Sequence, residues 1–163
     1  MGEALVVGYG NALRSDDGVG PAVAEAVAAD PRFAGVTVLA RHQLTPELAI
    51  DVSQAGLVVL VDAGHGQRPG AFSIEPLEPS GTGAGSSSHH LDPATLLALA
   101  AELYGPVPGA FSIRVGAGSL ELGDRLTPAV AAAVPDLVEA IAGLIATHRG
   151  EPAGPLVASA GHA

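Results

Sequence analysis

Residues 57–62, LVVLVD, restrict the fold more than any other part of the sequence. The first five are all aliphatic and follow one another without the polar alternation of a strand that has one face in water. Continuous apolar strands of this kind occur where both faces of a sheet are covered, as in parallel sheets flanked by helices. The run therefore predicts a central strand of an α/β fold.

Further strand and helix patterns alternate along the chain. Strands are predicted at 4–7, 35–40, 71–75 and 110–115, with 71–75 alternating as an edge strand does. Helices are predicted at 19–29, from Pro46 to about 53, from Pro93 through 103, and from Pro128 to about 148, with Thr45, Asp92 and Thr127 before the prolines. Pro135 predicts a kink or break in the last helix.

This alternation predicts one three-layer α/β domain over residues 1–149, with a mostly parallel five-stranded sheet and helices on both faces. The stretch 79–88 is rich in Gly and Ser and has no periodicity, so it is expected to be a mobile loop. Residues 150–163 are expected to be a disordered tail.

Composition excludes several classes of function. The chain of 163 residues has no cysteine, which excludes disulfides, thiolate zinc sites, iron–sulfur clusters and a cysteine nucleophile. Its net charge of −10 disfavours nucleic acid and anionic membranes as partners. With no secretory pattern and no run of about 18 apolar residues, a cytoplasmic location is expected. No G-x-S-x-G elbow follows a strand, which disfavours serine catalysis.

Ligands of open α/β sheets bind beyond the carboxyl ends of the strands, so polar residues at those ends are the leading site candidates. The loop 8–18, GYGNALRSDDG, lacks the third glycine of a dinucleotide fingerprint, because position 13 is leucine. The adjacent Asp16 and Asp17 would repel a pyrophosphate and suit a cation. The alternative is that Ser15 or Asp16 caps the next helix and Asp17 complements its dipole.

Two further positions are candidates for the same site. Asp62 ends the apolar strand, where a carboxylate must be paired, capped by loop amides or bound to metal. His89 and His90 precede the Asp92 cap, and imidazole is a usual ligand of nickel, zinc or copper. The alternative is a solvated histidine pair with no role. Asp17, Asp62 and His89 together form a possible site of two carboxylates and one imidazole.

At these residues the sequence resembles the hydrogenase maturation proteases, nickel-dependent endopeptidases that trim the large subunit of [NiFe]-hydrogenases. The likeness covers roughly residues 4–148. It runs through the loop 8–20, through VDA at 61–63 and SHHL at 88–91, and through VG, SLE and LTP at 115–116, 119–121 and 126–128. The order and the spacing of these segments agree with the family.

The resemblance implies that Asp17, Asp62 and His89 contact nickel already inserted in the precursor of the large subunit, so that the metal arrives with the substrate. The C-terminal extension of that precursor would then be cleaved. Asp16, His90 and His65 are second-rank candidates for assisting. Position 17 is aspartate where well-known members carry glutamate, and 41–48, RHQLTPEL, replaces a glycine-rich segment of some members, which leaves the choice of hydrogenase open.

Two other readings remain open at this point. One is a binding module on the same architecture, such as a nickel-sensing chaperone or a small-ligand carrier that holds an ion without hydrolysis. The other is a zinc hydrolase with a resident metal, which would be purified with near-stoichiometric zinc.

Overall fold

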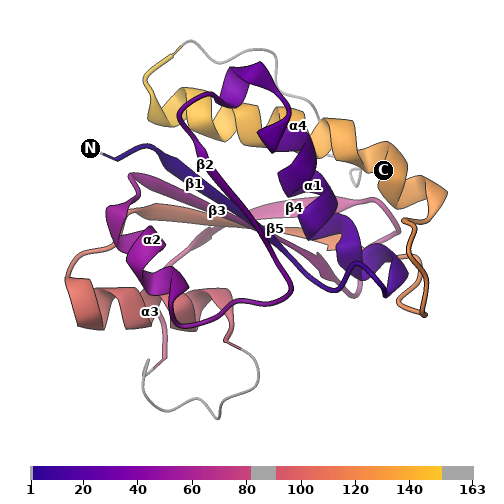
Figure 1. Ribbon diagram of the computed structural model, residues 1–163, viewed down its shortest axis with the longest axis horizontal. Coiled ribbons are helices and arrows are strands. Elements are labelled where there is room, and N and C mark those ends of the chain that lie inside the picture. Colours follow the sequence, from indigo (N-terminus) through magenta and orange to yellow (C-terminus); the bar gives the residue numbers. More distant parts are fainter. Residues whose placement is uncertain (1, 82–90, 152–163) are drawn as a thin grey trace.

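The computed structural model describes residues 2–81 and 91–151 and shows an α/β fold (Figure 1). Its five-stranded sheet has the order β2-β1-β3-β5-β4. The strands are β1 (Ala4–Tyr9), β2 (Thr37–Arg41), β3 (Leu57–Gly64), β4 (Phe72–Leu77) and β5 (Gly109–Gly116). All neighbouring pairs are parallel except β4 with β5, so β4 is an antiparallel edge strand.

Helices cover both faces of the sheet (Figure 1). Helices α1 (Val19–Ala28) and α4 (Pro128–His148) lie on one face, and α2 (Leu48–Gln54) and α3 (Pro93–Tyr104) lie on the other. Two short 3₁₀ turns, η1 (Ser15–Gly18) and η2 (Pro31–Phe33), flank α1. The predicted α/β class, with a mostly parallel five-stranded sheet between two helical layers, is confirmed.

The central place of β3 in the sheet explains its continuous apolar run at 57–61. Val59 and Val61 pack in the core beneath α1 and α4, whereas Val58 and Leu60 pack in the core beneath α2 and α3. Alternate side chains of a strand point to opposite faces, so covering both faces buries every position. The strand therefore needs an apolar residue at each step, and Asp62 is the first exception.

The predicted start of one helix is wrong, and of the kink or break predicted at Pro135 the break is absent. Helix α2 begins at Leu48 rather than Pro46, because the Leu48 amide donates to the Thr45 carbonyl at 3.1 Å and closes a turn instead. Helix α4 continues through Pro135 without a break. Its buried face holds both halves of the helix against the sheet and α1, through Val130, Ala133, Leu137, Val138, Ile141 and Ile145. The mobile loop expected at 79–88 and the tail expected at 150–163 lie largely outside the described residues.

Helix α4 is long and apolar enough, by length and composition, to span a membrane. Here its apolar face forms part of the core.

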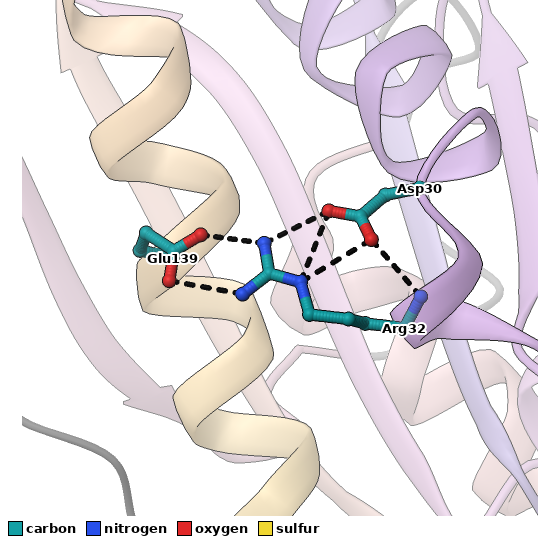
Figure 2. A network of polar contacts seen from close by, with 3 residues as sticks. All are labelled: Asp30, Arg32 and Glu139. Carbon is teal, nitrogen blue, oxygen red and sulfur yellow. Dashed lines mark hydrogen bonds and ion pairs between the residues drawn. The ribbon is translucent and has the colours of Figure 1, made fainter.

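A polar network also ties α4 to the segment after α1: the Arg32 guanidinium bonds to the carboxylates of Asp30 and Glu139 (Figure 2). All three groups lie at the surface, where such pairs contribute little individually. The network links η2 to α4.

Helix α1 starts unusually close to the ends of β1 and β3. A Cβ atom on Gly20 would lie 2.5 Å from the Tyr9 amide nitrogen and 2.6 Å from the Val61 carbonyl oxygen. Only glycine permits this approach. The helix start therefore holds the preceding loop against the carboxyl ends of these strands, beside Asp62.

Candidate functional site

A cavity of about 660 Å³ opens at the carboxyl ends of the parallel strands. Asp17, from the loop after β1, and Asp62, from β3, both line it. Its wall also includes residues of β4 and β5 and the start of α3. The structure therefore brings together the two carboxylates that the sequence analysis selected, although one comes from the loop after β1 and the other from β3.

Asp62 sits half-buried near the end of β3. Burial raises the pKa of its carboxyl group to about 6, and the negative charge of Asp17 acts in the same direction. The Tyr9 hydroxyl, the Arg114 guanidinium and the Ala63 amide favour the charged form but do not cancel the effect of burial. In return, burial and the Asp62 carboxylate raise the pKa of Tyr9. The charged form of Asp62 is thus less favourable in this site than in water.

Asp17 is held by its own loop. Its Oδ2 atom accepts a hydrogen bond of 2.7 Å from the Asn11 amide, which folds the loop back toward β1. Among the described residues, Oδ1 makes no hydrogen bond, so one oxygen remains available to a ligand. Helix α1 is capped by Gly18 without any side-chain bond, so the alternative role of Ser15 or Asp16 as its cap is not what the structure shows.

Asp16 has a different function from its neighbour. It is fully buried, and its Oδ2 atom accepts bonds from the Gly118 amide at 2.7 Å, the Ser119 amide at 3.1 Å and the Thr127 hydroxyl at 2.7 Å. Its Oδ1 atom accepts from the Thr127 amide at 2.7 Å. Burial alone would raise the pKa of Asp16, but these hydrogen bonds outweigh it and lower the pKa. Both oxygens are occupied, which leaves Asp17 to face the cavity.

Further hydrogen bonds to backbone carbonyls extend this attachment between the two loops. The Ser15 amide donates to the Gly123 carbonyl at 2.9 Å, and the Ser15 hydroxyl donates to the Glu121 carbonyl at 2.8 Å. Arg14 Nε donates to the Leu120 carbonyl at 3.2 Å. The SLE and LTP segments near the end of the sequence therefore serve as the support of the acidic loop.

The predicted site also includes histidines, with His89 as a metal ligand and His90 as a candidate for assisting. His89 and His90 lie outside the described residues. Within residues 2–81 and 91–151, no three His, Asp or Glu side chains are grouped as a metal site. His65 is exposed and does not line the cavity, which removes support for it as an assisting group. The two carboxylates are thus the part of the predicted site that the described residues contain.

The cavity residues that sequence reasoning did not select include His42 and Arg114. His42 directly follows β2, and Arg114 lies near the carboxyl end of β5. Strand β2 is parallel to β1, and β5 is parallel to β3, which is itself parallel to β1. The carboxyl ends of all four strands therefore lie at the same edge of the sheet. The rule that selected Asp62 would also have selected these two residues if the sheet order had been known.

Comparison with protein-family models finds no match, and comparison with curated proteins finds none either. Solved structures do match. The [NiFe] hydrogenase maturation protease HycI from Thermococcus kodakarensis is 26% identical, with a TM-score of 0.68 over 88% of this chain and 92% of that one. The hydrogenase 2 maturation peptidase from a Thaumarchaeota archaeon is also 26% identical, with a TM-score of 0.67 over 92% and 99% of the two chains.

A third match is the hydrogenase maturating endopeptidase HybD from E. coli. It is 24% identical, with a TM-score of 0.71 over 91% of this chain and 94% of that one. At this identity the match shows the shared fold alone. The chain therefore has the hydrogenase maturation protease fold, which it shares over most of its length with several [NiFe] hydrogenase maturation proteases.

Proposed function

We propose that this protein is a metal-dependent endopeptidase of the cytoplasm that removes the C-terminal extension from the nickel-loaded precursor of a [NiFe]-hydrogenase large subunit. The observation that carries the proposal is that Asp17 and Asp62 line one cavity at the carboxyl edge of the sheet. The matches to maturation proteases support the same reading.

The donor set suits a divalent cation that comes with the substrate. Two carboxylates that face one cavity repel each other, and part of the raised pKa of Asp62 is due to the charge of Asp17. A cation bound between them would remove this repulsion. We assign His89 as the third ligand, because nickel accepts both carboxylate oxygen and imidazole nitrogen. Ligands of the precursor would complete the coordination, so the protease needs no resident metal.

In this proposal the residues of the chain bind and orient. Asp17 and Asp62 hold the loaded site of the precursor against the sheet edge, and Tyr9 favours the charged form of Asp62. The cavity is within the usual volume range of small-molecule pockets, about 300–1,000 Å³, and so can take a short peptide segment. When bound, nickel supplies a Lewis acid that polarises the scissile carbonyl or lowers the pKa of an attacking water.

The test is incubation of the purified protein with a hydrogenase large-subunit precursor, with and without nickel loaded, followed by mass measurement of the products. We expect loss of the C-terminal extension only from the loaded precursor. Binding of the loaded precursor without any product would favour the nickel-sensing chaperone. Near-stoichiometric zinc in the protein as purified, with cleavage independent of nickel, would favour the zinc hydrolase.

The rate of processing is expected to rise as the pH increases through about 6 and then to level off, because Asp62 must lose its proton to bind a metal ion. Tyr9→Phe removes an interaction that favours the charged carboxylate, so the pKa of Asp62 should rise. The midpoint of the pH–rate profile should then move to higher pH. Tyr104→Phe, at an exposed tyrosine on α3, is the matched control and should leave the midpoint in place. A midpoint unaffected by Tyr9→Phe would contradict this role of Asp62.

A further inference from the structure

Arg114 is a cation next to the proposed metal ligand Asp62. The two residues are register partners on the neighbouring parallel strands β5 and β3, and both line the cavity. The positive charge of Arg114 acts on both Asp62 and Tyr9. The guanidinium therefore lies on the same side of the sheet edge as the carboxylate.

The Arg114 side chain lies against a glycine. A Cβ atom on Gly64 would lie 3.1 Å from Arg114 Nε and 3.4 Å from one of the terminal guanidinium nitrogens. The guanidinium thus lies against the bare backbone of Gly64, near the carboxyl end of β3. A Cβ atom at position 64 would make the Arg114 side chain shift by a few tenths of an ångström, so the glycine leaves it room in its present position.

Despite this proximity, Arg114 is not paired with Asp62. No nitrogen of its guanidinium comes within 4 Å of a carboxylate oxygen among the described residues, and it donates no hydrogen bond to them. Arg14, the other arginine of the cavity wall, donates instead to the Leu120 carbonyl. Arg114 therefore keeps a planar set of donors for a ligand in the cavity.

We propose that Arg114 is a catalytic residue that donates hydrogen bonds to the scissile carbonyl oxygen of the precursor and stabilises the negative charge that develops there. This inference rests on the proposed endopeptidase function. A carbonyl presented next to the ligand Asp62 would lie beside the neighbouring strand, which carries Arg114. Fixed donors aimed at a developing oxyanion are among the largest contributions to acyl-transfer catalysis.

The chemical step is hydrolysis of one peptide bond. Water attacks the carbonyl carbon, a carbon–oxygen bond forms, and the π electron pair moves onto the carbonyl oxygen, where Arg114 donates to the resulting oxyanion. When the carbonyl re-forms, the carbon–nitrogen bond breaks and the leaving amine takes a proton that the water has lost. The products are a new carboxylate and the released C-terminal peptide.

The experiment measures kcat and KM for the nickel-loaded precursor with Arg114→Gln, Arg114→Lys and the control Arg125→Gln. Arg125 is exposed and outside the cavity, and its substitution changes the net charge by the same amount. Removing one donor to an oxyanion should lower kcat about 100-fold in Arg114→Gln, with KM within about 3-fold of wild type. The kcat of Arg114→Lys should lie between those of wild type and Arg114→Gln, because lysine keeps the positive charge but lacks the planar guanidinium with its several donors.

The assay is run at about pH 8, where a carboxyl group with a pKa of about 6 is charged, and over a pH series. An unchanged kcat in Arg114→Gln would overturn the proposal. A higher KM with a normal kcat would also overturn it, because Arg114 would then contribute to substrate binding but not to the chemical step. A loss that disappears at high pH would also overturn it, because Arg114 would act through the pKa of Asp62. Failure of the wild type to cleave would instead count against the proposed function.

Discussion

Asp62→Asn is expected to lower the rate of processing of the nickel-loaded precursor by at least about 100-fold, since loss of a group that only orients a metal ligand already costs about 10–100-fold. The asparagine has nearly the same shape but no charge to neutralise the cation. Folding should not suffer, because burial disfavours the charged form of Asp62 in the native state, as its raised pKa records. Rate assays and thermal unfolding of the same samples measure both effects.

Asp124→Asn is the matched control, because Asp124 is exposed in the loop before α4 and does not line the cavity. Its variant should process the precursor at the wild-type rate. Asp17→Asn should behave like Asp62→Asn, since both carboxylates face the same space. If the wild type is active and the Asp62 variant processes the precursor at a near-normal rate, Asp62 is not a ligand of the site. The main support for a centre with two carboxylates would then be lost.

Asp16→Ala is expected to lower the free energy of unfolding by about 3 kcal/mol or more, because it removes a fully buried charged acceptor and leaves four hydrogen-bond donors without it. Those partners are the amides of Gly118, Ser119 and Thr127 and the Thr127 hydroxyl. Denaturant unfolding followed by circular dichroism measures the loss. Asp124→Ala, at the surface, should change the stability little.

The same contacts predict how stability depends on pH. The pKa of Asp16 is lower in the folded protein than its ordinary value, because its hydrogen bonds outweigh the effect of burial. Its contribution is therefore complete above the ordinary carboxyl pKa and is lost as the pH falls toward the lower folded value. In Asp16→Ala this part of the acid dependence should disappear. An equal acid dependence in both proteins, or a stability loss no larger than that of the surface control, would contradict the role assigned to Asp16.

Several features of the fold follow from short stretches of sequence. The apolar run of β3 predicts a strand covered on both faces, because any polar side chain there would be buried on one face or the other. Asp92 caps α3 as expected, accepting a 2.8 Å bond from the Thr95 amide. At Thr45 the same pattern of a cap residue and a proline predicts the wrong helix start. The Leu48 amide donates to the Thr45 carbonyl and closes a turn, and the helix begins only at Leu48. Local patterns locate elements well but place their ends less well.

The site was predictable to the extent that it depends on strand ends. Asp62 lies at the end of an identifiable apolar run, so its place at the sheet edge could be inferred. The carboxyl ends of β2 and β5 carry His42 and Arg114, but their meeting with Asp62 depends on the strand order, which no local pattern contains. Which of two adjacent aspartates faces the cavity was likewise open in the sequence.

By itself, then, the sequence determined the α/β class, the buried central strand and the acidic loop after β1, because each depends on neighbours within a few residues. Only the tertiary structure decided the division of work between Asp16 and Asp17. Asp16 is bound by residues more than a hundred positions later, in the segment that joins β5 to α4. Both carboxylate oxygens of Asp16 accept these hydrogen bonds, and Asp17 is the residue of the pair that faces the cavity. Hydrogen bonds between such distant segments form only when the whole sheet and its helices are assembled.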